Sequence, residues 1–168
     1  MIKTEIAYLA GLLDGEGYIG IKRSKPYKPN HEVSVKYSCR VQVRMVEPHG
    51  IELLCKLFNG HSYKEKAHCN NGRPLYCYQA SDRIAANILK TVLPYLRVKK
   101  IQAQKVLELA ELKKETSKHR TKLVGYRNMK HWTGKIIQMP NLAYSDEFIG
   151  QMESLWQQCI SLNRVGYI

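Results

Sequence analysis

The sequence predicts an α+β fold in which helices alternate with pairs of strands in the order αββαββα, followed by C-terminal helical residues. Apolar residues recur at helical spacing near the N-terminus, a two-residue alternation runs over 33–46, and two strand-like runs flank the turn NNGR. The 168 residues are the length of one domain. We divide it into a core of about 4–115, a basic segment 116–144 and a C-terminal helix 145–162.

The first helix, over residues 2–13, leads into the stretch LAGLLDGEGYIG. One side carries a stripe of small residues spaced four apart: Ala7, Gly11 and Gly15. Such a stripe lets another backbone approach closely, either the sheet of the same domain or a second helix. Asp14 and Glu16 follow among the glycines, where each carboxylate can either cap backbone N–H groups or bind a metal ion.

Two strands follow, and the second is long. In YIGIKRS, Ile19 and Ile21 alternate with polar neighbours. In VSVKYSCRVQVRMV, residues 33–46, the odd positions are mostly apolar and the even positions are basic, hydroxyl or amide. One face of this pair is therefore core, and the other is a basic row of Lys22, Lys36, Ser38, Arg40, Gln42 and Arg44.

Caps and turns delimit the remaining elements. They are a helix from Pro48 that Gly60 ends, strands over 61–69 and 75–80, a helix capped by Ser81 and closed by Pro94, a helix over 99–115, and a helix capped by Ser145. The phase of LYCYQA stays open: either Tyr76 and Tyr78, or Cys77 and Gln79, face the core.

The charge balance indicates a polyanionic partner. Lys and Arg number 27 against 14 acids, a net charge of +13. Arginine pairs with guanine edges and glutamine with adenine edges, and an antiparallel ribbon fits the major groove. The basic row therefore favours nucleic acid over the alternative of a solvated charged face, and the acid-free stretch 116–138 suits phosphate contacts.

Several classes are disfavoured. The sequence contains no run of 18 apolar residues, so no membrane span is predicted. The N-terminus lacks a signal-peptide layout. We therefore expect an intracellular protein with no membrane partner, in the cytoplasm or nucleoid, or in an organelle matrix if organelle-encoded. The five cysteines form no C-x-x-C pair, so His68, Cys69 and Cys77 are poor zinc ligands and better strand residues.

A carboxylate near phosphates is costly unless a divalent cation lies between them. Mg²⁺ takes carboxylate, carbonyl and phosphate oxygens, and it can activate water for phosphodiester hydrolysis. The residues alone leave capping and metal binding at Asp14 and Glu16 evenly matched.

At these residues the chain resembles a known family. LAGLLDGEG, residues 9–17, is similar to the nine-residue motif of the LAGLIDADG homing endonucleases. LPYLRVKKIQAQKVLEL, residues 93–109, resembles the family segment that carries a basic residue near the active site. The order αββαββα over about 4–115 is similar to one family domain. The resemblance implies a Mg²⁺-dependent endonuclease that hydrolyses phosphodiester bonds in both strands of DNA.

The resemblance also implies site residues. The metal ligands would be the Glu16 carboxylate and the Gly15 carbonyl, with Asp14 as a structural cap at the helix end. Lys99, rather than its neighbour Lys100, would stabilise charge at the scissile phosphate.

The family places a glutamine and then a basic residue just past the second strand. Met45 and His49 stand there, so His49 would be the basic residue and the water-ordering role would be vacant or moved to Gln42.

A single motif implies a homodimer, in which Ala7, Gly11 and Gly15 contact the partner's copy of the helix. A two-fold protein reads a two-fold site, so the target would be a long, near-palindromic double-stranded DNA. The reading residues would be Lys22, Ser24, Lys36, Ser38, Arg40, Gln42, Arg44 and Gln79, with Glu65 a further candidate. Two alternatives on the same fold are an RNA maturase that binds its host intron and a DNA-binding regulator without catalysis.

Overall fold

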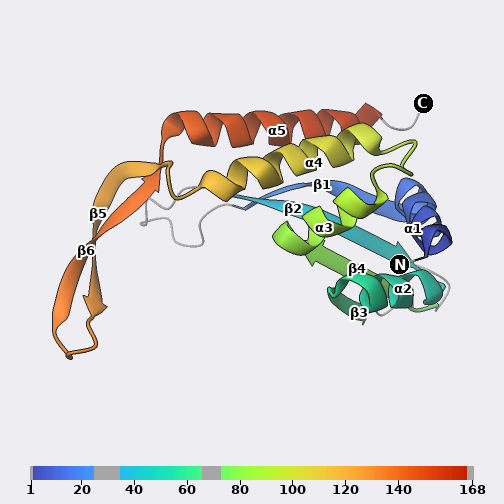
Figure 1. Cartoon of the computed structure of the whole chain (residues 1–168), viewed down its shortest axis with the longest axis horizontal. Coiled ribbons are helices and arrows are strands. Elements are labelled where there is room, and N and C mark those ends of the chain that lie inside the picture. The colour runs from blue at the N-terminus through green and yellow to red at the C-terminus, as the bar shows by residue number, and fades with distance from the viewer. Residues whose placement is uncertain (1, 25–34, 66–72, 166–168) are drawn as a thin grey trace.

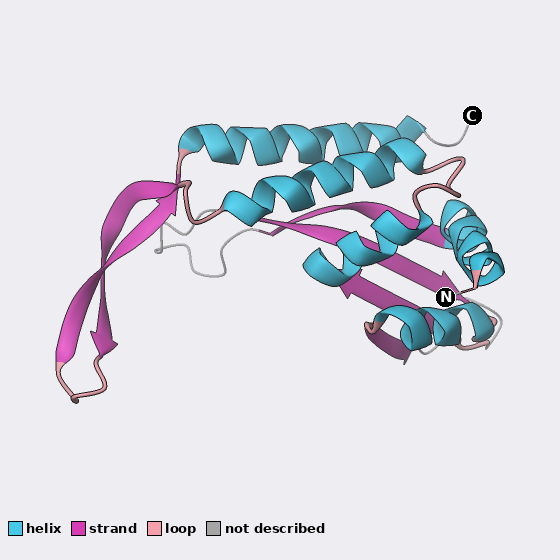
Figure 2. Cartoon of the chain, in the orientation of Figure 1, coloured by secondary structure: helices cyan, strands magenta, loops and turns pink. Residues whose placement is uncertain are grey.

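The computed structural model describes residues 2–24, 35–65 and 73–165. Helices cover one face of a four-stranded antiparallel sheet, and a separate two-stranded hairpin extends from one end (Figures 1 and 2). The predicted α+β class and the order αββαββα are confirmed. Within the described residues, no helix combines the length and apolar character that crossing a bilayer requires.

The sheet has the strand order β1-β2-β4-β3. Its strands are β1 (Gly17–Ser24), β2 (Lys36–Met45), β3 (His61–Glu65) and β4 (Leu75–Ser81). The alternation expected over 33–46 thus forms β2, although residues 33 and 34 lie outside the described part, as do the residues 66–69 expected in the third strand.

The register places the apolar residues of neighbouring strands together. Ile19 lies opposite Val41, and Val41 lies opposite Ala80, and all three are buried beneath the helices. Tyr78 pairs with Val43 on the same face, so the first of the two phases considered for LYCYQA is the observed one. Cys77 is also buried, but on the opposite face.

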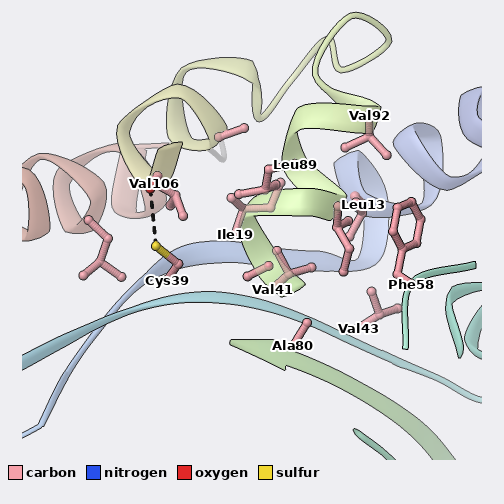
Figure 3. Packing of buried hydrophobic residues seen from close by; sticks show 14 of the residues in the cluster. Leu13, Ile19, Cys39, Val41, Val43, Phe58, Ala80, Leu89, Val92 and Val106 are labelled. Carbon is pink, nitrogen blue, oxygen red and sulfur yellow. Dashed lines mark hydrogen bonds between the residues drawn. The ribbon is translucent and has the colours of Figure 1, made fainter. Parts of the chain in front are cut away.

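Five α-helices and one short 3₁₀ helix are present in the described residues. They are α1 (Lys3–Glu16), α2 (His49–Phe58), α3 (Asp82–Val92), α4 (Lys100–Leu112), η1 (Lys113–Glu115) and α5 (Asp146–Val165). Their apolar faces share one core with the sheet, in which Leu13 of α1, Ile19 of β1 and Leu89 of α3 meet (Figure 3).

Two expected helix caps are wrong in detail. Asn59, not Gly60, has the left-handed backbone at the end of α2, with φ of 51°. Gly60 has a different requirement, because a Cβ there would overlap the ring of Tyr78. Ser81 does precede α3, but its hydroxyl makes no cap bond and instead accepts a 3.0 Å hydrogen bond from Nη1 of Arg40. Ser145 does cap α5, since its Oγ accepts from the Phe148 N–H at 3.3 Å.

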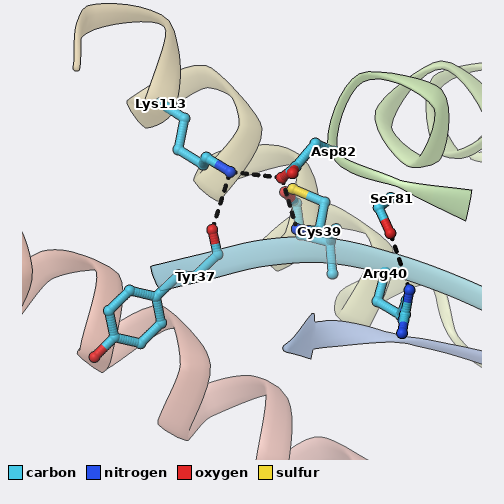
Figure 4. A network of polar contacts seen from close by, with 7 residues as sticks. Tyr37, Cys39, Arg40, Ser81, Asp82 and Lys113 are labelled. Atoms are coloured by element: carbon cyan, nitrogen blue, oxygen red, sulfur yellow. Dashed lines mark hydrogen bonds and ion pairs between the residues drawn. The ribbon is translucent and has the colours of Figure 1, made fainter. Parts of the chain in front are cut away.

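A polar network joins the helical layer to β2 (Figure 4). Lys113 Nζ lies 2.5 Å from Asp82 Oδ1 and 2.9 Å from the Tyr37 carbonyl oxygen. The same Asp82 oxygen accepts from the Cys39 N–H at 3.3 Å. Burial raises the pKa of the Cys39 thiol to about 12, so this cysteine is an unreactive core residue. The network fixes α3 and η1 to the covered face of β2, leaving its other face open.

The basic segment 116–144 forms an unexpected hairpin of β5 (Arg120–Lys130) and β6 (Ile136–Tyr144). It projects from the end of the molecule opposite α1 (Figure 1). The sequence shows no strand signal here because both faces of the ribbon are exposed, so apolar and polar residues do not sort by face.

Candidate functional site

The end of α1 exposes one carboxylate. The helix stops at Glu16 and β1 starts at once, with the Gly17 N–H donating to the Leu13 carbonyl. A Cβ at Gly17 would lie 2.7 Å from the Leu13 Cα, so this abrupt turn requires glycine. The Glu16 side chain is exposed and makes no hydrogen bond or ion pair with any residue in the described ranges. It is therefore available to an external cation.

Asp14, two residues earlier, is bonded to the protein itself. Its two carboxylate oxygens accept from the backbone N–H groups of Arg97 at 2.7 Å and Lys99 at 2.8 Å. Lys99 is the N-cap residue of α4. The carboxylate thus holds the segment leading into α4, and the capped backbone belongs to that segment rather than to the end of α1.

The Lys99 side chain lies across the junction between α1 and β1. Its Nζ donates to the carbonyl oxygens of Leu13 at 3.0 Å and Gly17 at 2.6 Å. Burial lowers the pKa of Lys99, while the nearby Asp14 and Glu16 carboxylates act in the opposite direction. The structure thereby places a partly buried ammonium beside the Glu16 backbone, at the negative end of the α1 dipole.

The metal donors available on one chain are few. The Gly15 carbonyl lies in the last turn of α1, where the helix supplies no N–H partner. Across the described ranges, no three His, Cys, Asp or Glu side chains gather as a ready-made metal site. His68 and Cys69 lie outside those ranges, so the expectation that they are strand residues is not addressed. The Glu16 carboxylate and the Gly15 carbonyl are adjacent oxygen donors at this end of α1.

The small stripe of α1 faces outward. Ala7, Gly11 and Gly15 are exposed, and a Cβ added at Gly11 or Gly15 would meet nothing within 4 Å. The opposite side of the helix packs on the sheet through Leu9 and Leu13. Packing of the stripe against its own sheet is therefore the wrong alternative.

Met45 ends β2, and His49 begins α2. The His49 ring is exposed, with its centroid 6.3 Å from that of Tyr8, about two turns of α1 before Glu16. Met45 is half-buried, and its sulfur would lie 3.1 Å from a Cβ at Gly50. The structure therefore places His49 beside α1 but shows no contact with Glu16, and Met45 is a packing residue.

The open face of the sheet gathers the polar side chains in cross-strand rows. The longest row is Tyr18, Gln42, Gln79 and His61. The other rows are Gly20, Arg40 and Ser81; Lys22 and Ser38; Ser24 and Lys36; and Arg44, Cys77 and Tyr63. All eight sequence-predicted reading residues thus share this face.

Some residues on this face were not anticipated. Tyr18 lies over Gly20, because a Cβ at Gly20 would collide with its hydroxyl. The inward alternation of Ile19 and Ile21 already implied that Tyr18 points outward. Arg44 Nη2 lies 3.0 Å from Glu65 Oε1, and the Tyr63 hydroxyl and the Glu65 carboxylate raise the pKa of Arg44. The ion pair with Glu65 thereby holds the guanidinium of the long Arg44 side chain in one position.

A comparison with known families decides the relationship. The sequence model described as LAGLIDADG endonuclease matches residues 9–116, more than half of the chain. The chain belongs to the LAGLIDADG endonuclease family. No curated protein matches this LAGLIDADG chain in sequence.

Solved structures of homing endonucleases share the fold of this LAGLIDADG protein. The endonuclease I-CvuI, solved with the I-CreI target and Mg, is 18% identical, with a TM-score of 0.65 over 95% of this chain and 82% of the other. The archaeal intron-encoded endonuclease I-Vdi141I, complexed with DNA, is 15% identical, with a TM-score of 0.65 over 98% and 87%. At these identities the likeness establishes the fold.

Proposed function

We propose that the protein is a homing endonuclease that cuts both strands of a long, near-palindromic DNA duplex by divalent-metal-dependent phosphodiester hydrolysis. The observation that carries the proposal is the free Glu16 carboxylate beside the Lys99 ammonium, at the rim of a basic sheet face. An acid in that position suits a cation bridging protein and phosphate.

The donor set fits Mg²⁺. Glu16 and the Gly15 carbonyl are hard oxygen donors, and Mg²⁺ commonly keeps waters and phosphate oxygens as its other ligands. When bound, such a cation supplies an activated water and stabilises the leaving oxygen. Complexes of I-CvuI with Mg and with Ca support a divalent cation in relatives.

The protein's own residues would orient this chemistry. Asp14 holds the backbone of Lys99 in place, and Lys99 holds the carbonyls on either side of Glu16. The backbone that carries Glu16 is thereby held in place, while no direct ion pair neutralises its carboxylate. The Lys99 ammonium also contributes positive potential where charge develops on the scissile phosphate.

A homodimer would complete the site. Two copies of α1 packed through Ala7, Gly11 and Gly15 would bring two Glu16 carboxylates together, one for each DNA strand. Each sheet would then read one half-site through the row of Gln42 and Gln79 and through Arg40 and Arg44. His49, whose ring lies beside Tyr8 at the start of α2, would be the basic residue that the family places after the second strand.

Glu16→Gln tests the proposal. The variant keeps size and removes the charge, so we expect cleavage to fall by about 100-fold or more while DNA affinity stays nearly unchanged. The substrate is the duplex selected by the wild-type protein from a randomised near-palindromic library with Mg²⁺. Glu52→Gln, an exposed acid on α2, is the matched control and should cleave normally. Cleavage that survives in Glu16→Gln would refute the metal assignment.

One observation favours a second candidate, a DNA-binding regulator without catalysis. Met45 is packed against Gly50 where the family places a water-ordering glutamine. Tight binding of the selected duplex by the wild-type protein, with no cutting in Mg²⁺ or Mn²⁺, would establish this alternative and refute cleavage.

A further inference from the structure

The β5–β6 hairpin lies outside the matched family region, residues 9–116, and contacts the hydrophobic core through Tyr144 at its base. Its outer half is exposed on both faces, and Trp132 in its turn is 89% exposed. The His131 N–H closes the turn by donating to the Lys135 carbonyl at 2.8 Å. A ribbon of this length without a core of its own is typical of a binding arm.

The charge of the hairpin is of one sign. No acid occurs between Glu115 and Asp146, whereas the segment carries Lys118, Arg120, Lys122, Arg127, Lys130 and Lys135. The cations near the base are engaged: Lys118 with Glu115, Lys122 with Asp146, and Arg120 over the Tyr144 ring.

Toward the tip the cations are open. Arg127, Lys130 and Lys135 make no ion pair within the described residues. The distal half of the hairpin therefore presents unneutralised positive charge, which complements a phosphate backbone.

The register separates two different faces. On one, Asn128 lies directly opposite Gln138, with Tyr126 and Lys130 on either side. On the other, Met129 lies opposite Ile137, and Arg127 lies opposite Met139. The first face, here called the amide face, combines paired amides with an aromatic ring and a cation.

The amide face repeats the chemistry of the open sheet face. There, Gln42 lies opposite Gln79, with Tyr18 and Arg40 on neighbouring positions. A two-stranded antiparallel ribbon fits the major groove, and asparagine and glutamine make bidentate bonds to adenine. The amide pair of the hairpin thus has the shape and the donors for reading base edges.

The hairpin is also placed to continue the sheet surface outward. A cavity of about 380 Å³ between the start of β2 and the hairpin base is lined by Lys36, Lys113, Arg120 and Asn141, among others. Lys36 at the start of β2 and Arg120 at the base of the hairpin thus line one cavity, so the hairpin adjoins the sheet at this end. Because α1 would lie at the centre of a symmetric site, the hairpin would lie at its outer end (Figure 1).

We propose that the β5–β6 hairpin is a second DNA-reading element, whose amide face binds the duplex outside the stretch covered by the sheet. The inference rests on the proposed DNA function but not on cleavage. Asn128 and Gln138 read bases at the outer positions of each half-site, and Lys130 on the same face and Lys135 in the turn contact flanking phosphates. The recognised site is correspondingly longer than the sheet alone specifies.

The test compares base preferences of full-length proteins. The double variant N128A/Q138A and its matched control M129A/I137A each remove one directly opposed pair, from opposite faces of the ribbon. Each protein selects from randomised duplexes long enough to extend past both hairpins. We expect N128A/Q138A to lose preference at the outermost positions and to bind the wild-type site about 5-fold to about 100-fold more weakly. The control should keep the wild-type preferences and bind within about two-fold.

Each other outcome is decisive. Identical preferences for wild type and N128A/Q138A would overturn the proposal, as would a loss confined to M129A/I137A. If no duplex is selected by any protein, the proposed DNA function fails; if inner positions are selected without a hairpin effect, only this inference fails.

Trp132 provides a direct signal. In the W156F variant it is the one remaining tryptophan, and its emission should change on binding the selected duplex. An emission change that concentrated protein shows without DNA would overturn the proposal. A change that folded RNA produces and the selected duplex does not would overturn it as well.

Discussion

Lys99 and Gly17 are joined by a 2.6 Å hydrogen bond from the lysine Nζ to the glycine carbonyl oxygen. A second bond, to the Leu13 carbonyl at 3.0 Å, places the ammonium across the turn that carries Glu16. Lys99 lies 82 residues from Gly17 in the sequence and is the N-cap of α4, so the start of α4 supports the end of α1. Loosening this junction should therefore change catalysis before it changes DNA binding.

Lys99→Met should lower the single-turnover cleavage rate by about 100-fold, because the variant keeps the stem and removes the charge at the scissile phosphate. Lys100→Met is the matched control, since Lys100 is the exposed neighbour and makes no hydrogen bond in the described structure. DNA affinity, measured by titration, should stay within a few-fold for both. An equal loss of cleavage in the two variants would show that general positive charge, and not the Lys99 contacts, is what matters.

Asp14→Ala should lower the free energy of unfolding by about 2 kcal/mol, because two backbone N–H groups lose a charged acceptor. Urea titration measures this loss. Asp146→Ala, which removes an exposed ion pair with Lys122 and an acid from the first turn of α5, should change stability by less than about 1 kcal/mol. If Asp14→Ala were as stable as the control, the carboxylate would have to be assigned to metal binding instead.

Local patterns predicted most of the fold because each buried element has a periodic apolar face. The alternation in 33–46 matches β2, whose inward residues Tyr37, Cys39, Val41 and Val43 are all buried. The hairpin at 120–144 was not predicted, because a ribbon that is exposed on both faces has no periodic apolar pattern.

The candidate site also has a part that local patterns predicted and a part that they could not predict. The positions of Glu16 and the small stripe follow from the motif, and the basic row follows from the alternation of β2. The bonds of Asp14 to Arg97 and of Lys99 to Leu13 join distant segments, so no local pattern encodes them. The Ser81 hydroxyl was predicted to cap α3, but Arg40 lies across the strand pair and is a stronger, charged donor.

Arg44→Ala should relax base choice at one position of each half-site, with a cost of about 1–3 kcal/mol for the preferred base. Glu65→Gln should alter preference at the same position, because Glu65 fixes Nη2 of Arg44 at 3.0 Å. Selection on randomised duplexes measures both, with Arg83→Ala on α3 as the control that changes neither. A uniform loss of affinity across all sequences would make Arg44 a phosphate contact.

Glu153 should make folding stability depend on acid pH. The Tyr37 hydroxyl and the Arg23 guanidinium lower its pKa below the ordinary 4.5 and tie α5 to the sheet. Because the folded-state pKa is depressed, the stabilisation is complete above about pH 4.5 and is lost as the pH falls through the folded-state pKa. The difference in unfolding free energy between wild type and Glu153→Gln should therefore shrink from pH 6 toward about pH 3. A difference that stays constant over this range would place the effect in packing.

Gly11→Leu should separate dimerisation from folding. The site is open, with nothing within 4 Å of an added Cβ, and leucine favours the helix over glycine by roughly 0.8 kcal/mol. The monomer should therefore become more stable, while the bulky side chain prevents the two α1 helices from meeting through the small stripe. Sedimentation should show a monomer, and cleavage of the near-palindromic duplex should be lost because each copy supplies one Glu16. Gly150→Leu on α5, also open and helical, is the matched control and should remain dimeric. A Gly11→Leu protein that still sediments as a dimer would rule out the α1 pairing.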